Sequence, residues 1–144
     1  WKGAVMTKDL DVLWSPGDVE IPALAQRFGR GTEAHQRHGV WLDAVSSALP
    51  PMPAGWKTRS KPITGPWENL RLFAVDLHDL IVSKLKRWSA KDRDDIRFLC
   101  EGSPSPVDPD VLRERFNDVL GPPEGMEDNL ERVVALLEGN LAEL

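Results

Sequence analysis

The hydrophobic and polar positions of this chain follow two different periods. In the first half, short apolar runs with β-branched and aromatic residues are closed by turn-forming residues, which is typical of β-strands. Strands are predicted over residues 9–14, 40–46 and 70–75. In the second half, apolar residues recur every three to four positions, as on the buried face of a helix. The pattern therefore predicts an α+β fold, with a small mixed sheet near the N-terminus and a helical C-terminal half.

Capping residues and helix breakers predict where the helices begin and end. Residues 18–29 show helical spacing closed by Gly29. Asp76 is expected to cap the next helix, with Lys84 and Trp88 on its apolar face. Further helices are predicted from Ser89 to Gly102, where Ser89 and Asp92 form a capping pattern, from Asp108 to residue 120, and over residues 125–142.

Two segments carry no clear period. Residues 30–39 are polar and are predicted to be irregular. Residues 50–66 hold five prolines and two glycines, which indicates an ordered loop or an edge hairpin. His35 and His38 lie three residues apart in the first of these segments, and a polar loop is the favoured interpretation over a metal site. Trp56 and Trp67 flank the proline-rich segment and could stack on a nucleobase.

The composition favours one globular domain without a membrane span. The chain has 144 residues, of which 41% are hydrophobic and 28% charged, and no apolar run approaches the roughly 20 residues of a membrane helix. A single cysteine, Cys100, cannot form an internal disulfide and suits a reducing cytoplasm, where a buried structural thiol is expected. No paired Cys or His spacing indicates zinc. The chain begins with Trp1, so we expect the natural N-terminus to lie upstream.

The charge is distributed unevenly. Residues 1–66 carry 8 basic and 6 acidic side chains, whereas residues 104–144 carry 3 basic and 10 acidic ones, a net charge of −7. A polyanionic ligand is therefore expected to meet the first hundred residues. The alternative is that the acidic segment is only a solvated helical surface. We predict a domain over residues 1–103 and a helical extension over residues 104–144 that packs on it.

Two aspartates interrupt the first predicted strand. Side chains alternate along a strand, so Asp9 and Asp11 share one face, while Leu10 and Val12 face the other way. Asp43 occupies the equivalent face of the strand over residues 40–46, and pairing of the two strands would bring three acids together. Carboxylates that close repel one another unless a cation lies between them, and Mg²⁺ is commonly held by one or two carboxylates together with substrate phosphates. The alternative is that these acids simply end a strand at a solvent-facing turn.

Three stretches resemble the DNA polymerase β-like nucleotidyltransferase superfamily. "TKDLDVL" resembles its acidic strand, and "WLDAV" resembles the strand that carries its third carboxylate. "DLHDLIVSKLKRWSAKDRDDIRFL" is similar to the corresponding segment of minimal bacterial nucleotidyltransferases, including the AbiEii toxin-like families. The resemblance covers roughly residues 6–99. It differs in one respect, because the glycine turn that cradles phosphates in the superfamily, some ten residues before the acidic strand, has no counterpart here. Gly3 is too close to Asp9 to fill that role. Either the turn lies in a missing N-terminal stretch, or residues between the turn and the acidic strand are missing, or the site is degenerate and does not catalyse; Trp1 as the first residue favours the first two.

The resemblance implies roles for particular residues. Asp9 and Asp11 match the metal-binding pair and Asp43 the third, catalytic acid; Lys84, Lys91, Asp92 and Asp95 match a later basic and acidic cluster. Lys84 and Lys91 would bind nucleotide phosphates, and Asp92 would join the catalytic set. Two alternatives come from the residues themselves. Lys84 could extend from the edge of the core or pair with Asp92, and acids in the first turn of a helix favour its dipole without any catalytic role.

The resemblance also implies an activity. Such an enzyme uses Mg²⁺ or Mn²⁺ to move a nucleoside monophosphate from a nucleoside triphosphate to an acceptor hydroxyl on RNA, such as a tRNA end, or on a protein. It would be a cytoplasmic bacterial toxin with a cognate antitoxin. Two alternatives stay open at this point: a catalytically inactive relative that acts as a binding or antitoxin module, and a purely structural partner.

Overall fold

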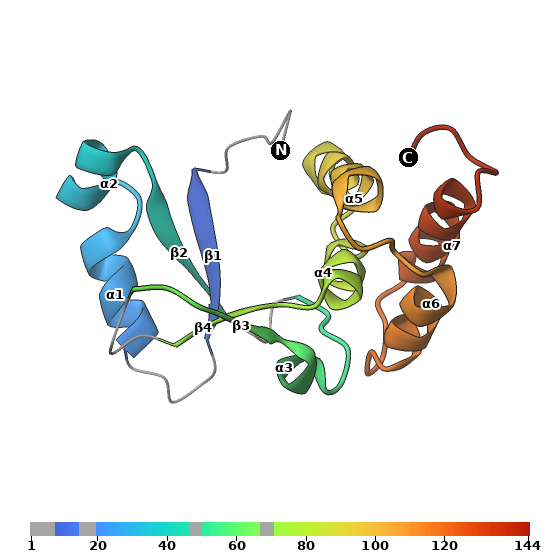
Figure 1. Cartoon of the computed structure of the whole chain (residues 1–144), viewed down its shortest axis with the longest axis horizontal. Helices are drawn as coiled ribbons and strands as arrows, with labels where there is room; N and C mark the ends of the chain where they lie inside the picture. The colour runs from blue at the N-terminus through green and yellow to red at the C-terminus, as the bar shows by residue number, and fades with distance from the viewer. Residues whose placement is uncertain (1–7, 15–19, 47–49, 67–70) are drawn as a thin grey trace. The chain divides into compact units, whose positions relative to one another are not determined.

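The computed structural model describes residues 8–14, 20–46, 50–66 and 71–144 (Figure 1). The chain divides into two compact units, residues 1–49 and residues 50–144, and each is described by itself. Trp67 and Gly3, to which the sequence drew attention, lie outside the described residues.

The first unit is built around two parallel strands. β1 (Asp9–Trp14) pairs with β2 (Trp41–Ser46), and parallel strands need a crossover connection. That connection carries α1 (Glu20–Phe28) and α2 (Glu33–His38), and α1 packs against β2. Figure 1 shows the two strands side by side in blue and teal. The strands predicted over residues 9–14 and 40–46, and the first helix, are confirmed.

The prediction of an irregular segment over residues 30–39 is wrong. Thr32 caps α2, because its hydroxyl oxygen accepts a hydrogen bond from the backbone N–H of His35. Gly39 ends the helix in the left-handed conformation, with φ of 71°, which glycine adopts without a steric penalty. A helix of six residues with Ala34 as its single apolar side chain has no apolar period, so only these two caps could have predicted it.

The second unit combines a short antiparallel pair of strands with a group of helices. Its elements are α3 (Trp56–Arg59), β3 (Lys61–Ile63), β4 (Leu72–Ala74), α4 (Leu77–Lys84), α5 (Ala90–Gly102), α6 (Pro109–Asn117) and α7 (Met126–Leu137). β3 and β4 are antiparallel. The α+β class is therefore confirmed, although the described strands form two separate two-stranded sheets rather than one mixed sheet.

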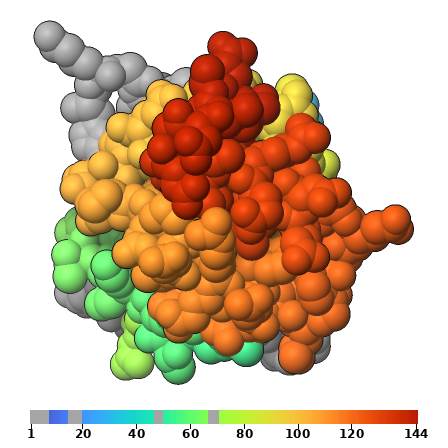
Figure 2. Space-filling view, turned by 90° about the vertical axis from the view of Figure 1, so that its right-hand side faces the viewer, coloured from blue at the N-terminus to red at the C-terminus, as the bar shows by residue number. Residues whose placement is uncertain are grey.

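Helices α4 to α7 enclose the hydrophobic core of the second unit. It consists of Ile81, Val82, Leu85, Ile96, Val107, Leu112, Phe116, Val119, Met126, Leu130, Val133 and Val134. α6 and α7 contribute to it together with α4 and α5, so residues 104–144 share one core with the segment before them. Figure 2 looks onto the face that α6 and α7 (orange to red) cover. Among the described residues, no helix is both long and apolar enough to cross a membrane.

The caps predicted for the helices are present, but three helices end earlier than predicted, and one of them is α6, which ends at Asn117 and not at residue 120. Asp76 caps α4, Ser89 and Asp92 form the capping box of α5, and Asp108 caps α6. The helix begun at Asp76 does not reach Trp88, because α4 ends at Lys84 and Trp88 has a positive φ of 47°. α7 ends at Leu137 and not at residue 142, since Gly139 is in the left-handed conformation.

Candidate functional site

An acidic face lies on the strand pair of the first unit. In the register of β1 and β2, Asp11 pairs with Asp43 and Asp9 pairs with Trp41. Paired residues of neighbouring strands point to the same side of a sheet, and Asp9 is two residues from Asp11. Asp9, Asp11 and Asp43 therefore share one face, as the sequence predicted. Leu10, paired with Leu42, faces the other way.

The acidic face is open to water, and its carboxylate oxygens are ligands that suit a hard cation. The side chains of Asp11 and Asp43 are exposed, and Asp9 is half-buried. Like charges placed directly opposite one another on neighbouring strands are destabilising, which favours a cation at this place. Carboxylate oxygens are the ligands that Mg²⁺ prefers. Among the described residues, however, no three side chains of His, Cys, Asp or Glu come together closely enough to form a metal site. The face supplies suitable ligands on adjacent strands, and its side chains are not gathered around one point.

Lys84 lies in the second unit, at the end of α4. Its Nζ donates a hydrogen bond to Oδ2 of Asp95 on α5 over 2.7 Å. From the sequence, either Asp92 or a phosphate was predicted as the partner of this ammonium group. In the structure its partner is Asp95 and not Asp92. An ammonium group has three hydrogens to donate. The bond to Asp95 therefore holds Lys84 in place and leaves donor capacity for a further acceptor.

Asp92 has a structural role at the start of α5. Its carboxylate accepts hydrogen bonds from the backbone N–H of Ser89 and from the guanidinium of Arg87, and its side chain is almost fully buried. Burial opposes ionisation, yet the hydrogen bonds from Arg87 and Ser89 hold the pKa of Asp92 well below its usual range. These contacts favour the interpretation that Asp92 stabilises the helix start. Lys91 is exposed in the first turn of the same helix.

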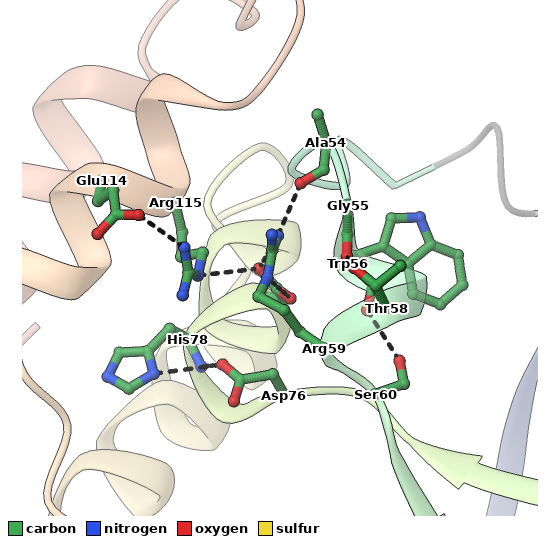
Figure 3. Close-up of polar contacts among 11 residues, drawn as sticks. Ala54, Gly55, Trp56, Thr58, Arg59, Ser60, Asp76, His78, Glu114 and Arg115 are labelled. Carbon is green, nitrogen blue, oxygen red and sulfur yellow. Dashed lines mark hydrogen bonds and ion pairs between the residues drawn. The ribbon is translucent and has the colours of Figure 1, made fainter.

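A buried charge cluster that was not predicted from the sequence joins α3, α4 and α6 of the second unit (Figure 3). Asp79 on α4 is fully buried and accepts two hydrogen bonds, each 2.9 Å, from Nε and Nη2 of Arg59. Arg59 also donates to the backbone carbonyl of Ala54, and Nε of Arg115 lies 3.9 Å from Asp79 Oδ1. The hydrogen bonds from Arg59 to Asp79 raise the pKa of the guanidinium. This cluster ties the proline-rich segment and α6 to α4.

Asp76 and His78 resemble a catalytic dyad but are used for structure. Nδ1 of His78 lies 3.3 Å from Oδ1 of Asp76 (Figure 3). Nε2 of His78 accepts a hydrogen bond from the backbone N–H of Asp108 over 3.0 Å. The nitrogen that would act as a base is therefore already occupied. His78 joins the start of α4 to the start of α6.

The remaining candidates from the sequence have separate surroundings. His35 lies in α2 next to Trp41 rather than in a loop, and the described residues include no metal site around it. Trp56 is half-buried, with the ammonium of Lys57 5.6 Å from its ring centroid. Cys100 is half-buried against the core, and burial raises the pKa of its thiol to about 11.

Comparison with known proteins places this geometry in a family. Residues 2–120 match the family described as "Nucleotidyltransferase of unknown function (DUF6036)". The match covers well over half of the chain, so the chain belongs to this family. No curated protein and no solved structure matches the chain.

Proposed function

We propose that this member of the family moves a nucleoside monophosphate from a nucleoside triphosphate to an acceptor hydroxyl. The family description supports the reaction class. The register that sets Asp11 beside Asp43 is the observation that carries the proposal, because it places carboxylates from two strands on one exposed face. The acceptor oxygen would form a bond to the α-phosphorus as the bond from that phosphorus to the bridging oxygen breaks. The electron pair would leave with pyrophosphate.

Mg²⁺ or Mn²⁺ would be held by Asp9, Asp11 and Asp43, and when bound it supplies charge neutralisation at the phosphates. The strands fix the backbone of all three residues, so only side-chain rotation is needed to bring the carboxylates together. Asp43 is exposed and can accept the proton of the acceptor hydroxyl. Lys84, in the second unit, donates a hydrogen bond to Asp95, and its assignment to a phosphate contact rests on the family resemblance.

The experiment is a label-transfer assay with a charge-matched control. The full chain is incubated with each α-³²P-labelled nucleoside triphosphate, Mg²⁺, total RNA and a protein extract, and the products are separated by size. We expect labelled product from the wild type, a loss of more than about 100-fold in Asp43→Asn, and unchanged labelling in Asp94→Asn, which removes an exposed acid from α5.

Each outcome of this assay decides something. Labelling that persists in Asp43→Asn would contradict the assignment of the site. Absence of labelling from the wild type with every nucleotide would overturn the reaction and favour an inactive binding or antitoxin module. Mn²⁺ broadening of the β1 and β2 amide signals in NMR spectra tests the metal independently, and Asp43→Asn is expected to weaken it.

The toxin role rests on the resemblance of residues 76–99 to toxin-like nucleotidyltransferases. It predicts that induced expression arrests bacterial growth and that Asp43→Asn relieves the arrest. A labelled band that is sensitive to ribonuclease would identify an RNA acceptor, whereas a band sensitive to protease would identify a protein acceptor. Growth unaffected by an active wild-type enzyme would contradict the toxin role alone.

A further inference from the structure

Trp41, the first residue of β2, is contacted by two side chains from the corner between α1 and α2. The guanidinium carbon of Arg30 lies 5.5 Å from the centroid of the Trp41 ring system, in a cation–π arrangement. The ring of His35 meets Trp41 edge-on, with centroids 4.8 Å apart and an angle of 69° between the planes. Arg30 from the connection between α1 and α2, His35 from α2 and Trp41 from β2 thus form one cluster within the first unit.

Arg30 is held by an aromatic ring rather than by an acid. Its side chain is exposed, and in the part of the chain that the structure describes no carboxylate lies within ion-pair distance of the guanidinium. Arg37 in the neighbouring helix differs, because it pairs with Glu33. A guanidinium has five N–H donors in a fixed planar arrangement that matches phosphate oxygens. Stacking on Trp41 orients this group and leaves its donors available.

His35 adds a further donor to the cluster. The backbone N–H of Gly31 donates to Nδ1 of His35 over 2.9 Å, so Nδ1 is the acceptor nitrogen. In the neutral imidazole the hydrogen is therefore on Nε2. The polar groups that Arg30 and His35 still offer are all hydrogen donors, and such a set recognises an anion rich in acceptors rather than a cation or an amine.

The cluster stands beside the acidic face and is open. Trp41 is in register with Asp9, and it lies two residues before Asp43 on the same face of β2. Residues so spaced have Cα atoms roughly 6.5 to 7 Å apart. A side chain placed at Gly31 would meet nothing within 4 Å, so the corner next to Arg30 is unfilled. One triphosphate chain can therefore meet donors at one end and carboxylate-bound cations at the other.

From this juxtaposition we propose that Arg30, His35 and Trp41 form a subsite for the polyphosphate of the nucleotide. The proposal rests on the proposed function for its substrate, although the subsite itself needs neither metal nor turnover. A polyphosphate carries several charges within a short span, which suits a compact donor set. The backbone of a nucleic acid presents one charge per nucleotide and is the competing source of phosphate.

The test measures binding of inorganic tripolyphosphate to the full chain by calorimetry, without divalent metal and at low ionic strength. Arg30→Gln removes the charge and keeps most of the side-chain length. Arg27→Gln is the matched control, since Arg27 is also in the first unit and also lies over an aromatic ring, at 5.6 Å from Phe28. We expect Arg30→Gln to weaken binding by about tenfold and Arg27→Gln to leave it within about twofold.

Three results would overturn the subsite: equal affinity of the wild type and Arg30→Gln, an equal loss in Arg27→Gln, or tighter binding of a trinucleotide with only diester phosphates than of tripolyphosphate. The first would exclude Arg30, the second would indicate unspecific attraction, and the third would assign the cluster to a nucleic acid strand. Binding is measured without metal, so the two proposals can fail separately. If no label is transferred but tripolyphosphate binding still depends on Arg30, the proposed reaction is wrong and the subsite is supported. Circular dichroism of each variant checks that the fold is retained.

Discussion

Replacement of Asp79 by asparagine is expected to lower the free energy of unfolding of the second unit by about 3 kcal/mol. Asp79 is fully buried and holds Arg59 through two hydrogen bonds of 2.9 Å, with Arg115 3.9 Å away. Asparagine keeps the shape and removes the negative charge that Asp79 places between the two guanidinium groups. Breaking a buried ion pair from one side costs about 3 to 5 kcal/mol. The lower end applies, because the side chains of Arg59 and Arg115 retain 22% and 19% of their exposure and can be hydrated in part.

Urea unfolding followed by circular dichroism at 222 nm measures this loss, since most of the described helical residues belong to the second unit. Arg113→Gln is the control. Arg113 is also on α6, but its side chain is partly exposed and meets Glu131 at 3.4 Å, Asp110 at 3.7 Å and Glu138 at 3.8 Å. Each exposed pair of this kind contributes at most about 1 kcal/mol. A loss below about 1 kcal/mol in Asp79→Asn, or an equal loss in the control, would refute the reasoning that burial makes this cluster costly to break.

Two further predictions concern titratable groups of α5. The pKa of Asp92 is lower in the folded state than in the unfolded state, so its ion pair stabilises the fold above about pH 4 and this stabilisation is lost as the pH falls further. In Asp92→Asn, the free energy of unfolding is therefore expected to fall less than in the wild type when it is measured from about pH 5 down to about pH 2. With a pKa of about 11, Cys100 holds far less thiolate at pH 8 than an unfolded chain, so iodoacetamide is expected to modify the native thiol on the order of 100-fold more slowly than the thiol in urea. A difference in the free energy of unfolding between wild type and Asp92→Asn that does not change with pH would contradict the first prediction. Equal alkylation rates of the native and the unfolded thiol would contradict the second.

The elements that the sequence predicted well are those with local signals. Asp76, Ser89 and Asp108 each accept a hydrogen bond from a backbone N–H only two or three residues away, so the cap can be read from neighbours in the sequence. The two strands of the first unit combine apolar alternation with flanking turn residues. Their parallel pairing then follows from the long connection between them.

The contacts that the sequence did not predict depend on distance along the chain. Arg59 and Asp79 are 20 residues apart, and no periodicity links a residue inside the proline-rich segment to one inside α4. The partner of Lys84 was unpredictable for a related reason. Asp92 and Asp95 lie one turn apart on α5, and Asp92 is held by Arg87 and Ser89, whereas Asp95 meets Lys84. The cluster around Trp41 likewise forms only when α2 folds against β2.

The aspartates of the acidic face are expected to affect both nucleotidyl transfer and the stability of the first unit, and the substitution Asp43→Asn tests both effects. The apolar pairs Leu10 with Leu42 and Val12 with Ala44 lie on the face opposite the acids, and a slip of one residue would exchange the two faces. The same register sets Asp11 against Asp43, where like charges cost about 0.2 to 1 kcal/mol. Asp43→Asn is therefore expected to stabilise the first unit by a few tenths of a kcal/mol, seen as slower amide exchange in β1 and β2, while it abolishes transfer. Millimolar Mg²⁺ is expected to stabilise the wild type and to remove that advantage. Faster amide exchange in Asp43→Asn without metal would show that the two acids are not in conflict, and the argument for a cation between them would fail.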